Sequence, residues 1–190
     1  LLDDPRKNAV LVGPGAGLTK ATAEKGLAAL ASGKAVVIDA DGLSIFTDAS
    51  ETLIEAITGP CLLTPHEGEF KRLFSVDGDK PTRARAAAKL TGAVVLLKGA
   101  DTVIAEKEGR AVINASGTPD LATAGSGDVL AGMALGLMTQ GMDLFDAGCA
   151  AAWLHGALAE DIGPGLIAED LPAKLPGILR QLRFTADTKP

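Results

Sequence analysis

Short runs of apolar, β-branched residues alternate along the chain with Ala-rich segments of helical period. Strands of this near-continuous apolar kind are typical of a parallel sheet covered on both faces by helices. The pattern predicts strands at Ala9–Val12, Ala35–Asp39, Cys61–Thr64, Ala93–Lys98, Thr102–Ala105 and Ala111–Asn114. It predicts helices at Lys20–Ser32, Glu51–Thr58, His66–Phe74, Thr82–Thr91, Ser126–Gln140, Asp143–Asp161 and near Leu171–Leu182. We therefore expect an α/β protein.

The last two predicted strands are joined by the four residues Glu-Lys-Glu-Gly, at 106–109. A short polar link that contains glycine is typical of a hairpin, so part of the sheet should be antiparallel. With 190 residues the chain can bury a core without disulfides or structural metal. We expect one domain over residues 1–184, followed by a polar, flexible tail at 185–190.

Charge and cysteine content exclude several classes of function. The formal net charge is −6 and no basic stripe is present, which argues against a nucleic-acid partner. No apolar run is long enough to cross a bilayer, so we expect no membrane partner. Cys61 and Cys149 lie in apolar contexts without metal-ligand spacing and are interpreted as reduced core thiols of a cytoplasmic protein.

Three polar or glycine-rich loops follow predicted strands, where open α/β sheets bind their ligands. These loops are Gly13–Gly17, Asp39–Gly42 and Thr64–Glu69. Each has a structural alternative: glycines that supply positive φ, Asp41 as a helix N-cap, and two first-turn acids, Glu67 and Glu69, that favour the helix dipole. The other histidine, His155, lies in an apolar helix, and we expect it to be a structural residue with its hydrogen bonds satisfied.

The segment Gly125-Ser126-Gly127-Asp128 opens a long Ala/Leu/Met helix. Glycines before a helix let unpaired N–H groups converge on an anion, and the helix dipole adds positive potential. A carboxylate in the first turn can accept a proton from a hydroxyl that attacks a bound phosphoryl group, although a helix cap is the alternative interpretation of Asp128.

Lys98-Gly99-Ala100-Asp101-Thr102 is the second candidate for nucleotide contact. Its lysine ends an apolar predicted strand and is followed by glycine, so it could contact a nucleotide phosphate or ribose. A solvated lysine at a strand end is the alternative.

Five segments carry motifs of one known family and follow one another in the order found in that family: GPGAG at 13–17, DADG at 39–42, LLTPHEGEFKRL at 62–73, LLKGADTVI at 96–104 and GTPDLATAGSGDVLAGMALGL at 117–137. In these segments the chain resembles the ribokinase-like superfamily, and within it the ADP/ATP-dependent NAD(P)H-hydrate dehydratases. The resemblance implies a three-layer α/β/α fold whose sheet is mostly parallel and ends in an antiparallel hairpin. It also implies that an N-terminal part of the family domain is absent from this chain.

The resemblance implies an enzyme, a carbon–oxygen lyase that restores NADH or NADPH from the (S)-hydrate. ADP or ATP would phosphorylate the ring hydroxyl with Mg²⁺ bridging the phosphates, and phosphate would then be eliminated. Asp128 would be the catalytic base, with Gly15 and His66 also contacting the hydrate. The nucleotide would contact Lys98, Gly99, Ala100, Asp101 and Thr102, and its phosphates would lie against Gly125, Ser126 and Gly127. No side chain is assigned as a metal ligand.

Two other functions remain open. The first is a small-molecule kinase of the same superfamily, acting on hydroxymethylpyrimidine or hydroxyethylthiazole, which would share the 125–128 segment. The second is a truncated, non-catalytic nucleotide-binding fragment. The implied missing segment further predicts either a homo-oligomer or a longer polypeptide that carries an epimerase domain.

Overall fold

The computed structural model describes residues 2–187. It contains one six-stranded sheet in the order β1-β2-β3-β4-β5-β6, which is also the order along the chain. The strands are β1 (Ala9–Val12), β2 (Ala35–Ile38), β3 (Cys61–Leu63), β4 (Val94–Leu97), β5 (Thr102–Ala105) and β6 (Ala111–Asn114). Strands β1 to β4 are parallel, and β5 and β6 continue the sheet antiparallel. The mixed sheet with a C-terminal hairpin is therefore confirmed.

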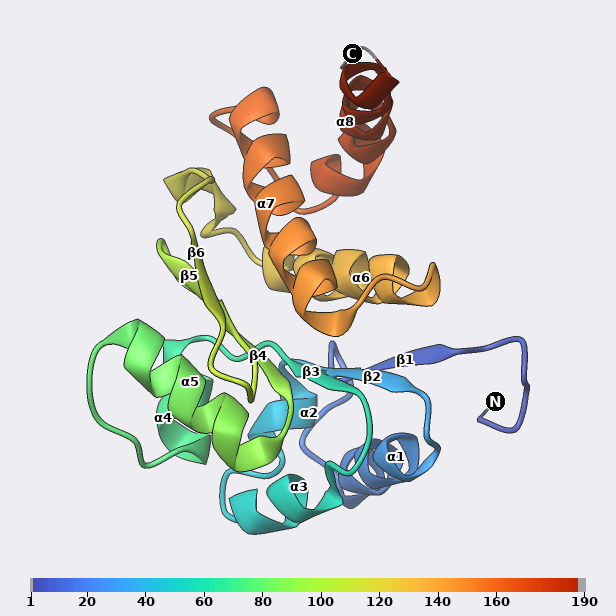
Figure 1. Ribbon diagram of the computed structural model, residues 1–190, viewed down its shortest axis with the longest axis vertical. Coiled ribbons are helices and arrows are strands. Elements are labelled where there is room, and N and C mark those ends of the chain that lie inside the picture. Colours follow the sequence, from blue (N-terminus) through green and yellow to red (C-terminus); the bar gives the residue numbers. More distant parts are fainter. Residues whose placement is uncertain (1, 188–190) are drawn as a thin grey trace.

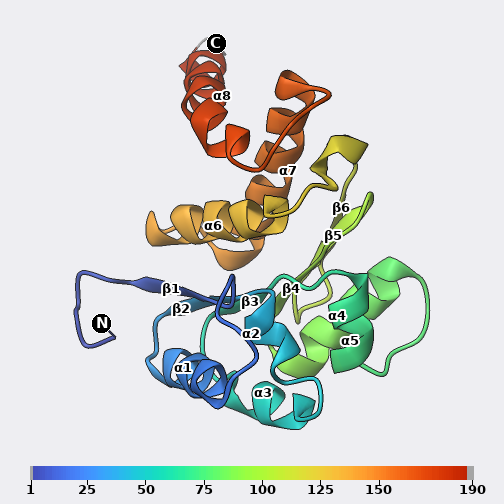
Figure 2. The same ribbon diagram turned by 180° about the vertical axis from the view of Figure 1, so that it is seen from behind.

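Helices cover both faces of the sheet (Figures 1 and 2). The helices α1 to α5 lie on one face and α6 and α7 on the other, with α8 packed against α6 and α7. Their bounds are α1 (Lys20–Ala31), α2 (Asp41–Ser44), α3 (Ser50–Ala56), α4 (Glu67–Leu73), α5 (Lys80–Thr91), α6 (Ser126–Thr139), α7 (Leu144–Ile162) and α8 (Asp170–Asp187), with a short 3₁₀ helix η1 (Pro119–Leu121) before α6.

The strands have near-continuous apolar sequences because each of their two faces has its own core. In β2, Val36 and Ile38 pack with α1 and α4, whereas Val37 packs with α6 and α7. The same alternation separates Leu62 from Leu63 in β3. Since side chains alternate across a strand, a sheet covered on both faces needs an apolar residue at almost every position.

Local signals set the helix starts. The carboxylate of Asp79 accepts a hydrogen bond from Thr82 N at 2.8 Å, so α5 begins two residues before its predicted start. Asp143 caps α7 in the same way through Phe145 N. Short helix α2 was not predicted, because four residues are too few for a helical period to show.

Helix α8 continues to Asp187, so residues 185–187 of the predicted tail are helical. Its last three residues, 188–190, lie outside the described residues, and the flexibility of the tail stays a prediction. Both cysteines have free thiols, and Cys61 is buried. Within residues 2–187, every helix is too short or too polar to cross a bilayer.

Candidate functional site

The carboxyl ends of the parallel strands meet at one edge of the sheet, and the loops after β1 and β2 pack directly against each other there. Gly13 has a φ of +135°, and a Cβ added to it would overlap the Asp39 carbonyl oxygen. A Cβ on Gly42 would lie 2.6 Å from the Val12 carbonyl oxygen. The glycines of both motifs therefore permit close backbone contact between two loops, in addition to any ligand they bind.

Asp41 joins these two loops. Its Oδ2 accepts a hydrogen bond from Gly17 N at 2.7 Å, so the carboxylate supports the glycine loop rather than capping α2. The N-cap of α2 is instead Ala40, which has a φ of +47°. Among the residues described, no other non-glycine residue has a positive φ. Such strained conformations persist where the surrounding contacts over-determine them, often at functional sites.

Lys98 has a protein partner that the sequence did not reveal. Its Nζ donates to Asp39 Oδ1 at 2.6 Å, and the Asp39 side chain is only 1% exposed. The second carboxylate oxygen, Oδ2, is buried and has no hydrogen-bond partner within the described residues. A Cβ on Gly127 would lie 3.3 Å from the same Nζ, so the ammonium group also lies beside the first turn of α6. The ion pair therefore connects β2 and β4 with the predicted anion site.

Helix α6 begins at Ser126 after Gly125, which has a φ of +83° and no side chain to cap the helix. Ser126 Oγ donates to the Leu121 carbonyl oxygen at 2.6 Å, which fixes the start of the helix. Within residues 2–187, the N–H groups of Gly127 and Asp128 have no protein acceptor. Unpaired N–H groups at the start of a 14-residue helix, with Lys98 beside them, fit a bound phosphoryl group.

Asp128 does not cap α6: its side chain makes no hydrogen bond or ion pair with the described part of the chain. The pKa of Asp128 is raised above its usual value, chiefly because the protein partly desolvates the carboxyl group. The negative charges of Asp39 and Asp41 raise the pKa further, and the positive charge of Lys98 opposes them. Raising the pKa of a carboxylate makes it a stronger proton acceptor, which suits a general base.

His66 lies beside this site but also has a structural role. Its Nδ1 accepts hydrogen bonds from Gly68 N at 2.9 Å and Glu69 N at 3.2 Å, while Glu69 Oε2 accepts from His66 N. His66 is thus the N-cap of α4, and its side chain remains 54% exposed. The backbone of Lys98 bonds to Pro65 at 2.8 Å, which brings His66 next to the end of β4.

The loop after β4 is held by its own side chains and by one residue that sequence reasoning missed. Thr102 Oγ1 donates to the Gly99 carbonyl oxygen at 2.8 Å, and Asp101 accepts from Lys80 Nζ at 2.8 Å. Lys80 is 9% exposed and its ammonium group packs against Gly99. The hydrogen bond from Lys80 lowers the pKa of the Asp101 carboxyl group. No sequence signal marks Lys80, because a lysine in the first turn of a helix has no special pattern.

The prediction for His155 is wrong in one respect. The residue is buried in α7, but its Nε2 is buried without a hydrogen-bond partner. Desolvation lowers the pKa of His155 to about 4, while a hydrogen bond with the Ser126 backbone raises it and the charge of Lys98 lowers it. His155 therefore lies next to the start of α6, close to the predicted anion site.

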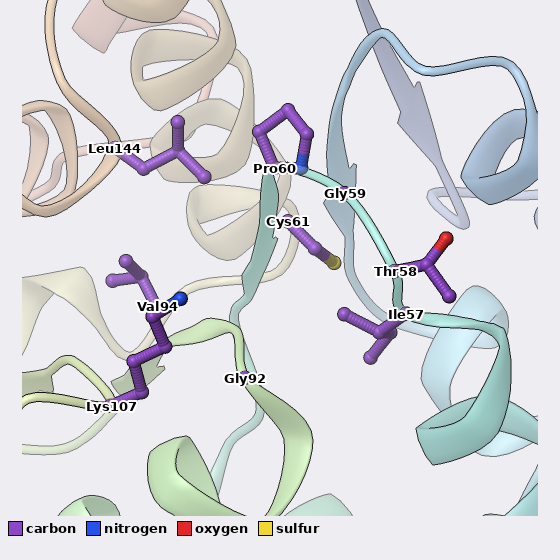
Figure 3. A pocket seen from close by; sticks show the side chains of 9 residues that line it. All are labelled: Ile57, Thr58, Gly59, Pro60, Cys61, Gly92, Val94, Lys107 and Leu144. Atoms are coloured by element: carbon purple, nitrogen blue, oxygen red, sulfur yellow. The ribbon is translucent and has the colours of Figure 1, made fainter.

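The described residues contain no group of three or more His, Cys, Asp or Glu side chains arranged to hold a metal ion. Two cavities also lie away from the predicted site residues. One, of about 290 Å³, lies at the amino ends of β3 and β4 (Figure 3). The other, of about 320 Å³, is an apolar groove between α6 and α8.

The chain is similar in sequence to several known proteins. Residues 2–177 match the family model described as NAD(P)H-hydrate dehydratase. The chain is 39% identical over 186 residues to an ADP-dependent (S)-NAD(P)H-hydrate dehydratase of Neisseria meningitidis, a match that covers 93% of this chain and 63% of that protein. It is 41% identical over 181 residues to a bifunctional NAD(P)H-hydrate repair enzyme of Salinibacter ruber, covering 90% of this chain and 33% of that enzyme.

Solved structures show the same fold. An ADP/ATP-dependent NAD(P)H-hydrate dehydratase of Bacillus subtilis, co-crystallised with ATP and Mg²⁺, superposes with a TM-score of 0.80 at 32% identity, over 92% of this chain and 64% of that one. A hydroxyethylthiazole kinase of Pyrococcus horikoshii has a TM-score of 0.74 at 20% identity, over 88% of this chain and 70% of that one, a likeness of fold alone. The chain spans less than two thirds of the length of both curated relatives above.

Proposed function

Because the chain belongs to the NAD(P)H-hydrate dehydratase family, we propose that it catalyses the nucleotide-dependent dehydration of (S)-NAD(P)H hydrate to NADH or NADPH. The observation that carries this proposal is the start of α6, where Asp128 has a raised pKa beside unpaired N–H groups and the Lys98 ammonium group. A base, an anion site and a cation in one place are what phosphoryl transfer to a hydroxyl requires.

In the proposed reaction Asp128 accepts the proton of the ring hydroxyl as the hydroxyl oxygen attacks the terminal phosphorus of ADP or ATP. The bond between that phosphorus and its bridging oxygen breaks, which leaves AMP or ADP. The C–O bond then breaks, with its electron pair leaving on the phosphate, and the neighbouring ring carbon loses a proton to water, which restores the double bond of the reduced nicotinamide. Mg²⁺, when bound, neutralises phosphate charge.

The nucleotide is assigned to the loop Lys98–Thr102 and to Gly125, Ser126 and Gly127. Lys98 can serve a phosphate while it stays bonded to Asp39, because an ammonium group has three donors and Asp39 Oδ1 accepts one. Gly15 and His66 are assigned to the hydrate. The carboxylate of Asp41 supports this assignment, since it holds the glycine loop near the ends of β1 and β2 through Gly17 N.

The experiment is to incubate the protein with NAD(P)H hydrate, Mg²⁺ and either ADP or ATP. We expect the absorbance of reduced nicotinamide to recover while free phosphate appears in equal amount. A stable phosphorylated product from hydroxymethylpyrimidine or hydroxyethylthiazole would instead identify a small-molecule kinase. Nucleotide binding without any turnover would identify a non-catalytic nucleotide-binding chain.

We further propose that the chain functions with additional protein at the free edge of β1, either a second copy or an epimerase-bearing part of a longer polypeptide. Among the described strands β1 pairs only with β2, and an edge strand presents backbone groups that can pair with another chain. Bifunctional relatives such as that of Salinibacter ruber support the second form. Light scattering of the purified 190-residue chain tests the first form, association with a second copy.

The cytoplasmic location of the protein remains a prediction.

A further inference from the structure

The segment between β6 and α6 leads directly into the proposed anion site, and it runs along one side of α7. We refer to residues 115–125 as the approach loop. Just before the loop, at the end of β6, Asn114 Nδ2 donates to the Ala152 carbonyl oxygen at 3.2 Å, and within the loop Gly117 N donates to Glu160 Oε1 at 3.0 Å. Positions 152, 156 and 160 are each one helical turn apart, so the loop is attached along a single face of α7.

Gly156, at the middle of that face, allows the loop to lie against the helix. A Cβ added there would overlap Ser116 Oγ and would lie 2.7 Å from the Ser116 carbonyl carbon and 2.8 Å from Gly117 N. Two of these three atoms belong to the backbone, so a rotamer change cannot relieve the overlap. Any side chain at position 156 must therefore displace the approach loop.

Helix α7 also reaches the other end of the approach loop. His155, the residue before Gly156, lies beside the Ser126 backbone, which acts on its pKa, and α7 contacts the 3₁₀ helix η1 of the approach loop. Ser126 in turn donates through Oγ to the carbonyl oxygen of Leu121, within the approach loop's 3₁₀ turn. Both ends of the approach loop therefore lie against the same helix, α7, which has 19 residues.

We propose that Gly156 and Glu160 are positioning residues for the proposed anion site at Gly125–Asp128. Neither touches a reacting atom; they set the place of the loop from which α6 starts. The inference rests on the proposed function, because its consequence is that Asp128 and the α6 N–H groups are held in line with the transferred phosphoryl group. Misplacement of such groups by about 1 Å can cost a hundredfold in rate.

The first test compares Gly156→Ala with Gly177→Ala. Both replace a glycine inside a helix by the better helix former, but a Cβ on Gly177 meets nothing within 4 Å. We expect Gly156→Ala to lower kcat by roughly tenfold or more and to raise the nucleotide Kd by a smaller factor. Gly177→Ala should leave both unchanged. Turnover and Kd of Gly156→Ala within twofold of Gly177→Ala would overturn the proposal.

A second pair keeps the proposal testable if Gly156→Ala does not fold. Glu160→Gln retains an oxygen that can accept from Gly117 N, whereas Glu160→Ala removes the acceptor. We expect Glu160→Ala to lower kcat several-fold and Glu160→Gln to retain most of it. Equal loss in both variants would mean that the charge matters rather than the hydrogen bond, and would overturn the role of Glu160.

The wild-type protein separates failure of this inference from failure of the proposed function. Absence of hydrate turnover in the wild type would reject the dehydratase proposal alone. Nucleotide titration calorimetry would still compare Gly156→Ala with Gly177→Ala, because it measures binding at the same turn without requiring the reaction.

Discussion

At the scale of single residues, Asp128 and Asp39 are two carboxylates at the same edge of the sheet with different surroundings. Asp39 is buried and bonded to Lys98, whereas Asp128 is exposed and has no partner among residues 2–187. The Asp39 carboxylate is already bonded to an ammonium group of the protein, whereas the unpaired Asp128 carboxylate is available to a substrate. We therefore assign proton transfer to Asp128 and electrostatic support to Asp39.

The first residue-scale prediction is that Asp128→Asn lowers turnover by roughly 10² to 10⁴, the usual loss on removal of a general base. The amide keeps the shape of the carboxylate but does not accept the hydroxyl proton. Nucleotide binding should change little, because the α6 N–H groups and Lys98 remain. Steady-state kinetics with calorimetry measures both quantities, and near-normal turnover would reject Asp128 as the base.

The second residue-scale prediction concerns pH. The negative charge of Asp39 raises the pKa of Asp128, so Asp39→Asn should lower that pKa. Asp128 would then remain ionised at lower pH, and the acidic limb of the kcat/KM profile should move to lower pH. Asp77→Asn is the control, since it removes an exposed carboxylate that is not among the charges acting on Asp128. A shift to higher pH, or equal shifts in both variants, would contradict this electrostatic account.

At the scale of elements, His66 shows how one side chain can serve both a helix and a site. As N-cap of α4 it satisfies two N–H groups, Gly68 N and Glu69 N, through Nδ1. Its side chain remains 54% exposed, and its backbone lies beside that of Lys98. The cap explains the local structure without reference to a ligand, so the two roles need to be separated by experiment.

The element-scale prediction uses the capping preferences of side chains. His66→Ala should destabilise the protein by about 1 kcal/mol through loss of the cap, whereas His66→Asn should retain the cap because asparagine is among the best N-cap residues. If His66 also contacts the hydrate, both variants should raise the KM for hydrate. Denaturant unfolding measures the first effect and steady-state kinetics the second. An unchanged KM in both variants would leave His66 with the capping role alone.

At the scale of the whole molecule, the buried imidazole of His155 links stability to pH. Its pKa is about 4 in the folded protein, against an ordinary value of 6.5. Between these pH values the unfolded chain binds more protons, so the free energy of unfolding decreases as pH falls through this range. This stability is present above the unfolded pKa and is lost as pH falls toward the folded one.

We predict that this group alone removes about 2 kcal/mol from the free energy of unfolding between about pH 7 and about pH 5. His155→Asn cannot titrate there, so its pH dependence should be smaller than that of the wild type by this amount. Denaturant unfolding of both proteins at the two pH values provides the comparison. Parallel pH dependences would show that His155 is not held neutral by burial.

Much of the architecture follows from the sequence because it depends on local patterns. The bounds of β1, β5 and β6 match the prediction, and the other strands differ by one or two residues at their ends. The apolar runs, the hairpin link at 106–109 and the glycines before α6 each act within a few residues of chain. The resemblance in five segments indicated the family for the same reason, since each segment is contiguous.

Tertiary structure alone decided the contacts between distant segments. The Asp39–Lys98 ion pair joins residues 59 positions apart, and the hydrogen bond from Gly117 to Glu160 spans 43 positions. Neither contact produces a periodic pattern in the sequence, because an ion pair or a hydrogen bond to the backbone needs only one suitable residue in each of the two segments. The unpartnered Nε2 of His155 likewise depends on which groups three-dimensional packing brings near it. The sequence by itself determined the elements and the family, while packing decided which polar groups meet at the site, since burial and distance exist only in the folded chain.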